Sequence, residues 1–123
     1  MAAGLATLEV LEREDGWALL EERGAKLEAL LEPTLRHAPW PLQLVRVGSI
    51  FWFCLQAGKP PRRSDQIESA AASRYKKLFH QLLNRGISIA PSAYEVGFIS
   101  LAHTDDHLHQ FTEAIHSSLL EVE

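Results

Sequence analysis

The chain has 123 residues, of which 46% are hydrophobic and 23% are charged. This is the balance of one folded domain and not of a disordered segment. Its 16 acidic and 12 basic side chains give a formal net charge of -4. Nucleic acid repels such a chain unless the basic groups cluster, and the densest group, between Lys59 and Arg63, is short. We therefore expect no nucleic-acid partner.

The cysteine count and the hydropathy indicate in which cellular compartment the protein is located. Cys54 is the only cysteine, so no internal disulfide is possible. It lies in the apolar run 50–55, where we expect a small buried hydrophobe. No apolar run approaches the roughly 20 residues that cross a bilayer, and the N-terminus lacks the pattern of a signal peptide. These features predict no membrane partner and a location in the cytoplasm or the plastid stroma.

Leucines at helical spacing predict two helices in the first third of the chain, over residues 1–12 and 15–32. Asp15 has the side chain of an N-cap for the second helix, and Pro33 predicts its end. The first helix opens at Met1 with no capping residue ahead of it. We therefore expect that more chain precedes it.

The middle of the chain predicts two strands, over residues 42–47 and 50–55. The second is apolar at nearly every position, which is typical of a central strand covered on both faces. A third helix is predicted to begin at Ser64 or Asp65 and to end near Asn84.

The last third predicts two short strands, over residues 87–90 and 98–102, and a final helix capped by Thr104. The whole order is α-α-β-β-α-β-β-α. It predicts a single α+β domain over residues 1–123, with a small antiparallel or mixed sheet covered by helices.

Three histidines and two aspartates between residues 103 and 109 form the densest group of metal-ligand side chains. His103 and His107 are four residues apart, a spacing that can bind zinc on one helix face. However, His103 ends a predicted strand, and the helix begins only after Thr104. No cysteine or glutamate completes a tetrahedral set, so we expect solvated polar residues and no metal site.

No complete catalytic set is apparent. Cys54 lies in mid-strand with no neighbouring cation to lower its pKa, so we expect an inert thiol. The sequence contains neither a Gly-x-Ser-x-Gly elbow nor a glycine-rich phosphate loop. Glu95 stands out because it lies in a loop between two predicted strands, where side chains often carry function. The pattern alone leaves two alternatives, a surface charge or a group directed into a cleft, and favours the first.

Three stretches together resemble one enzyme family: Met1–Glu9, Gly48–Phe51 and Gly86–Thr104. The most specific is the last, which reads GISIAPSAYEVGFISLAHT. They resemble the class III pyridoxal-phosphate aminotransferases and, within that class, the glutamate-1-semialdehyde 2,1-aminomutases. The likeness covers the whole chain, which corresponds to the C-terminal small domain of such enzymes. Residues 1–32 correspond to the helices that link it to a large domain.

The resemblance implies a homodimeric fold-type-I enzyme with pyridoxal phosphate held by the large domain, which is absent from residues 1–123. No cofactor-binding residue is expected here, because none of the four lysines (Lys26, Lys59, Lys76 and Lys77) lies in a Schiff-base motif. The implied activity is an isomerisation by intramolecular amino transfer. It converts glutamate-1-semialdehyde to 5-aminolevulinate for tetrapyrrole (porphyrin) biosynthesis, and this chain alone is expected to be inactive.

Two functional hypotheses follow. In the first, the matching loop of the family reaches the active site from the small domain, which implies that Glu95 faces the substrate. In the second, the chain is a freestanding, non-catalytic interaction module derived from an aminotransferase small domain.

Overall fold

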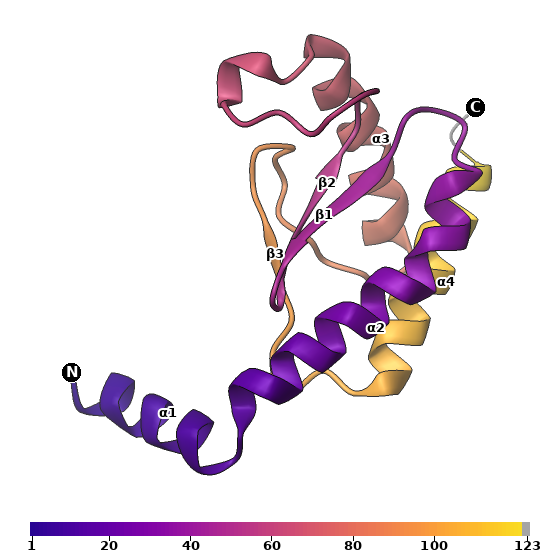
Figure 1. The fold of residues 1–123 in the computed structure, drawn as a ribbon. Coiled ribbons are helices and arrows are strands. Elements are labelled where there is room, and N and C mark those ends of the chain that lie inside the picture. The colour runs from indigo at the N-terminus through magenta and orange to yellow at the C-terminus, as the bar shows by residue number, and fades with distance from the viewer. Residues whose placement is uncertain (122–123) are drawn as a thin grey trace.

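The computed structural model describes residues 1–121, which form a three-stranded antiparallel sheet and four α-helices (Figure 1). The strands lie in the order β1-β2-β3, and both pairings are antiparallel. The α+β class and the central position of the second strand are therefore confirmed. The elements are α1 (Ala2–Arg13), α2 (Gly16–Arg36), β1 (Gln43–Val47), β2 (Ile50–Cys54), a 3-10 turn (Ser64–Gln66), α3 (Ser69–Asn84), β3 (Gly97–Phe98) and α4 (Asp105–Leu120).

The two late strands differ from the prediction. Residues 87–90 form no strand, because the chain there is still completing the end of α3: the Ile87 N–H donates to the Leu82 carbonyl at 2.9 Å. The strand predicted over 98–102 is reduced to Gly97–Phe98. Beyond it, the Ser100 N–H donates to a histidine side chain instead of to a strand. In both segments, local hydrogen bonds therefore replace the inter-strand hydrogen bonds that the sequence predicted.

Helix boundaries also differ from the prediction in three places. Helix α2 continues through Pro33 to Arg36, although proline removes one hydrogen bond and its ring crowds the carbonyl four residues earlier, because Leu27 and Leu31 of the same helix are buried in the core. Asp15 occupies the N-cap position with a left-handed φ of 51° and makes no side-chain capping bond. Ser64 and Asp65 lie in a separate 3-10 turn, and α3 begins only at Ser69. The Thr104 cap of α4 is confirmed.

The core lies between the helices and one face of the sheet. Phe51 and Phe53 project from β2 toward Phe111 of α4, with ring centroids 5.6 to 6.3 Å apart. Buried side chains of all three larger helices join them, among them Leu27, Leu31, Leu78, Leu82 and Ile115. Cys54 is fully buried, as expected, and burial raises the pKa of its thiol.

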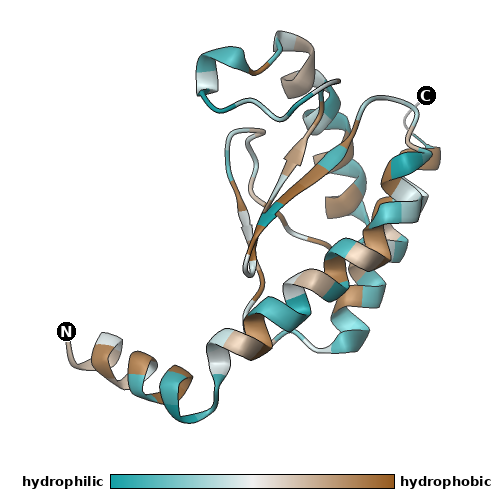
Figure 2. Ribbon diagram, in the orientation of Figure 1, coloured by the Kyte–Doolittle hydropathy of each residue, from teal (hydrophilic) through white to brown (hydrophobic). Residues whose placement is uncertain are grey.

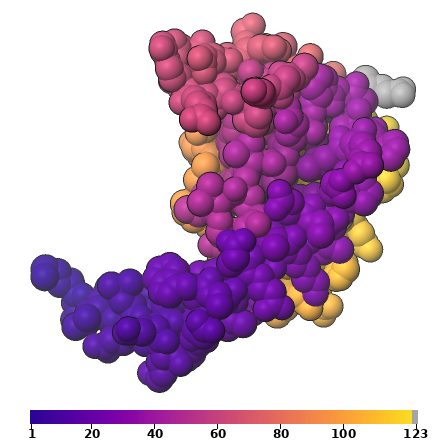
Figure 3. Space-filling view, in the orientation of Figure 1, coloured from indigo at the N-terminus to yellow at the C-terminus, as the bar shows by residue number. Residues whose placement is uncertain are grey.

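The opposite face of the sheet is open only near the β1–β2 turn, so the prediction that β2 is covered on both sides holds at Cys54, which is 0% exposed, and is wrong at Ile50. Val47, Ile50 and Phe98 are register neighbours on that face, and they are 78%, 40% and 66% exposed. Helix α1 projects from the body of the molecule (Figures 1 and 3), and its ribbon includes hydrophobic positions (Figure 2). Its Leu5 and Leu8 side chains are exposed. No helix within residues 1–121 is long and apolar enough to span a bilayer.

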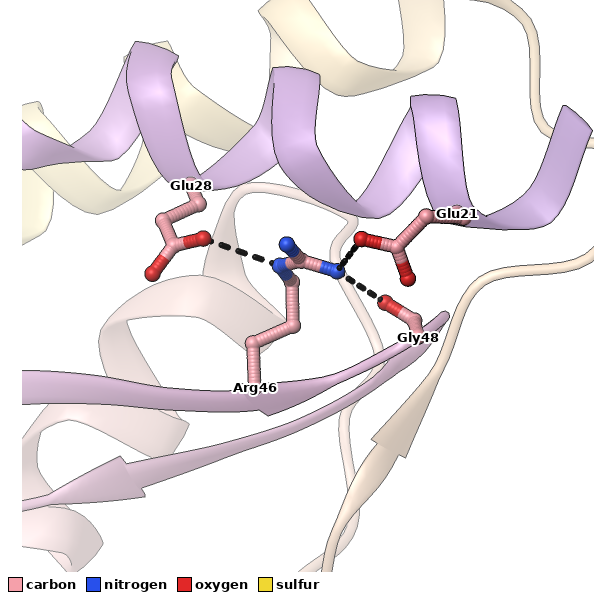
Figure 4. A network of polar contacts seen from close by, with 4 residues as sticks. All are labelled: Glu21, Glu28, Arg46 and Gly48. Atoms are coloured by element: carbon pink, nitrogen blue, oxygen red, sulfur yellow. Dashed lines mark hydrogen bonds and ion pairs between the residues drawn. The ribbon is translucent and has the colours of Figure 1, made fainter. Parts of the chain in front are cut away.

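Helix α2 is attached to the β1–β2 hairpin through Arg46 (Figure 4). The guanidinium donates to Glu28 and Glu21, both at 2.9 Å, and to the Gly48 carbonyl at 2.7 Å. The hydrogen bond to Glu28, followed by that to Glu21, raises the pKa of Arg46. Gly24 makes this approach possible, because a Cβ atom at that position would overlap the Gly48 carbonyl oxygen.

We expect Gly24→Ala to lower the free energy of unfolding by about 1–3 kcal/mol, because the hairpin must move away from α2. Gly4→Ala is the matched control, since an added Cβ there meets nothing within 4 Å. It should raise stability by at most about 1 kcal/mol through helix propensity. Urea unfolding of both variants tests this, and equal stabilities would contradict the close approach.

Candidate functional site

Glu95 lies on an irregular loop between α3 and β3, and its side chain is exposed. The loop is folded on itself by two local bonds. The Glu95 N–H donates to the Ser92 carbonyl at 3.1 Å, and the Tyr94 N–H donates to the Ser92 hydroxyl at 3.2 Å. Residues 1–121 contain no ion-pair partner for the Glu95 carboxylate. The carboxylate is therefore free to meet a group from outside this part of the chain.

Two aromatic side chains attach this loop to the fold. The Tyr75 hydroxyl, on α3, donates to the Ala90 carbonyl at 2.5 Å. The Trp52 indole N–H, on β2, donates to the Ala93 carbonyl at 2.7 Å. Tyr75 and Ala93 are buried, with exposed fractions of 4% and 5%. The loop is thus held before its turn, at Ala90, and within it, at Ala93.

The far end of the loop is held against β2. Gly97 pairs with Phe51 in the sheet, and a Cβ atom on Gly97 would overlap the Phe51 ring. The Ile99 N–H continues this pairing with a bond of 2.9 Å to the Ser49 carbonyl. The glycine therefore lets the chain after Glu95 lie flat over an aromatic side chain.

Two hollows adjoin the loop. The smaller, of about 10 Å³, is lined by Glu95, Tyr75 and Trp52 among others. The larger, of about 650 Å³, shares Val96 and Gly97 with it and extends to the start of α4. Burial, and secondarily the charge of Glu95, raises the pKa of Tyr75 to about 12. The negative charge of the Glu95 carboxylate therefore acts on the Tyr75 phenol, and both groups line the small hollow.

The histidine cluster is organised as a helix start. His103 and His107 line the larger cavity. Their Nδ1 atoms accept the backbone N–H groups of Ser100 and Thr104 at 2.9 and 3.1 Å. An acceptor Nδ1 places the proton of a neutral ring on Nε2, the reverse of what metal binding through Nε2 requires. Among residues 1–121, no group of three or more histidine, cysteine and acidic side chains could hold a metal ion.

The four lysines are either paired with an acidic side chain or exposed. Lys26 forms an ion pair with Asp105 at 2.5 Å, and the hydrogen bond lowers the pKa of the Asp105 carboxyl. Lys59, Lys76 and Lys77 are exposed on a loop and on α3. Among residues 1–121, no lysine lines either hollow.

Sequence reasoning selected Glu95 but missed the two side chains that hold its loop. In the sequence, Tyr75 falls within the predicted third helix and Trp52 within the apolar run 50–55. Their N–H and O–H donors were the available signal, because buried tyrosine and tryptophan usually find an acceptor. The identity of the acceptors depends on tertiary structure.

Comparison with known proteins decides the family. The chain is 38% identical over 115 residues to the glutamate-1-semialdehyde 2,1-aminomutase of Bdellovibrio bacteriovorus, a match that covers 94% of this chain and 27% of that protein. It is 39% identical over 125 residues to the Thermus thermophilus protein of the same name, covering 97% and 28%. The chain belongs to the glutamate-1-semialdehyde 2,1-aminomutase family. It spans about a quarter of the length of the curated relatives it matches.

The fold agrees with this assignment. A crystal structure of a glutamate-1-semialdehyde aminomutase from Pseudomonas aeruginosa PAO1, in complex with PMP, superposes with a TM-score of 0.75 at 22% identity. That match covers 89% of this chain and 24% of the other. No family model matches the chain.

The raised pKa of Tyr75 predicts a loss of stability at alkaline pH. The folded state holds the phenol proton more tightly than the unfolded state, whose pKa is near 10, so stability falls as pH rises from 10 to about 12. The loss is at most about 3 kcal/mol. Urea unfolding across this range should show a smaller decline for Tyr75→Phe than for the unsubstituted chain. Parallel declines would contradict the shift.

Proposed function

We propose that residues 1–123 are the C-terminal small domain of a glutamate-1-semialdehyde 2,1-aminomutase, inactive alone, with residues 1–32 as its linking helices. The observation that carries the proposal is the sequence match along nearly the whole chain to about a quarter of aminomutases. The rest of the enzyme is a large domain that binds pyridoxal phosphate. The complete enzyme is a homodimer of the cytoplasm or the plastid stroma.

Pyridoxal phosphate, when bound, supplies the chemistry that takes up and returns the migrating amino group. The reaction exchanges the amino group of glutamate-1-semialdehyde between neighbouring carbons and gives 5-aminolevulinate for tetrapyrrole biosynthesis. The part of this chain is to close over the substrate and to present the Glu95 carboxylate to one of its amino groups. The exposed position of Glu95 and its lack of an ion pair within residues 1–121 support that role. A carboxylate accepts a charge-assisted hydrogen bond from an ammonium group.

A second candidate is a freestanding, non-catalytic interaction module. The exposed apolar side chains of α1 and of the open sheet face favour it, because such surfaces mark contact sites. The intact mass of the native protein separates the two candidates. A subunit several times the mass of this 13.8 kDa chain supports the aminomutase, and a subunit of this mass supports the module.

We expect Glu95→Gln to lower turnover by about ten- to a hundredfold, from the loss of a charged hydrogen bond of about 1.5–3 kcal/mol. The assay uses a hybrid enzyme in which residues 1–123 replace the matching quarter of the Thermus thermophilus aminomutase. Glu113→Gln is the control, because Glu113 is exposed on α4, on no proposed site. Steady-state formation of 5-aminolevulinate and thermal melts are measured for both. Equal activities would remove Glu95 from the mechanism.

We also expect the 123-residue chain to form no covalent adduct at a unique lysine with pyridoxal phosphate, because none of its lysines lines a hollow at the site. The purified chain is mixed with the cofactor, reduced with borohydride and mapped by mass spectrometry. A stoichiometric adduct at one lysine would overturn this expectation and relocate the cofactor site.

A further inference from the structure

We infer that Tyr75 and Trp52 are positioning residues, which fix the direction of the Glu95 carboxylate by holding the carbonyls of Ala90 and Ala93. This inference rests on the proposed function of Glu95. Neither aromatic side chain needs to touch the substrate. Their role is to give the exposed carboxylate one orientation before the substrate arrives.

The attachments of the loop explain why these two bonds matter. The bonds within the turn, from Tyr94 and Glu95 to Ser92, tie the turn only to itself. Among residues 1–121, the side-chain hydrogen bonds that connect this turn to other elements are those of Tyr75 and Trp52. If either is lost, the turn is held by the other and by the pairing of Gly97 with Phe51. The turn and its internal bonds then become less ordered, and the Glu95 carboxylate loses its single orientation.

Both donors are themselves well fixed. Tyr75 is 4% exposed on α3, among the buried side chains of the core. Trp52 lies on the central strand, paired with Val45 of β1. Both bonds are partly shielded from water, where a hydrogen bond is electrostatically stronger. A rigid helix and a rigid strand thus hold one loop from two directions.

The electrostatics of the small hollow favour the same arrangement. Tyr75 can donate to Ala90 only while its phenol is protonated. Burial and the charge of Glu95 both favour the protonated form. The phenol is therefore a donor at neutral pH, where even an unperturbed tyrosine is protonated.

The first test measures loop order in the 123-residue chain by amide hydrogen exchange. Tyr75→Phe and Trp52→Phe each remove one donor and keep an aromatic ring. The Glu95 amide should exchange about two- to tenfold faster in each, the loss of one hydrogen bond, with less change in the α4 amides. The controls are Thr112→Val, which removes a side-chain bond inside α4, and Trp40→Phe, whose indole N–H has no partner within residues 1–121.

The second test measures coupling in the hybrid aminomutase. Tyr75→Phe and Trp52→Phe should each lower kcat by about two- to tenfold, with a smaller change in KM. In a Glu95→Gln background, the same substitutions should have little further effect, because they act through that carboxylate. A role limited to stability would give the same loss in both backgrounds.

The outcomes separate the two proposals. If Glu95→Gln slows turnover while both aromatic variants match their controls, the positioning inference fails and the proposed function stands. If Glu95→Gln matches Glu113→Gln, the proposed function of Glu95 fails, and the positioning inference fails with it. If a hybrid variant does not fold, the exchange experiment decides. Unchanged exchange of the Glu95 amide in both aromatic variants overturns the inference.

Discussion

The contact between α2 and the β1–β2 hairpin is the constraint on which the rest of the fold depends. It combines a missing side chain, at Gly24, with a long one, Arg46, whose side chain is only 14% exposed. The guanidinium satisfies its donors with two carboxylates of α2 and with the carbonyl of Gly48. Because the planar group has several donors in fixed directions, it sets both the distance and the angle between helix and hairpin.

The hairpin in turn supports the candidate site. β2 is bonded on one edge to β1, which α2 holds, and on its other edge to the short β3. Its alternating side chains serve two purposes. Phe51 and Phe53 build the core, and Trp52 reaches the loop that carries Glu95. The position of the Glu95 carboxylate therefore depends, through β2 and its partner β1, on helix α2.

The sequence predicts those parts of the fold that depend on local pattern. Helices α1, α2 and α4 were found from leucine spacing and from the Thr104 cap, and β1 and β2 from apolar, β-branched runs. Residues 87–90 have the same apolar character, but the end of α3 takes up their first N–H group, so no strand forms. Pro33 lies inside α2 because buried leucines on the same helix stabilise its last turns. Glu95 could be selected from a motif, whereas its supports could not, since tyrosine and tryptophan donors have no acceptor until the chain is folded.

The two aromatic donors bond main-chain carbonyls and not side chains. A carbonyl is present whatever residue occupies the position, so these bonds place no demand on the chemistry of the loop's own side chains. Ser92 and Tyr94 could be exchanged for other residues while both anchors remain. The side chains of the loop can therefore be changed without removing either anchor. Glu95 would keep its position while the side chains next to it change.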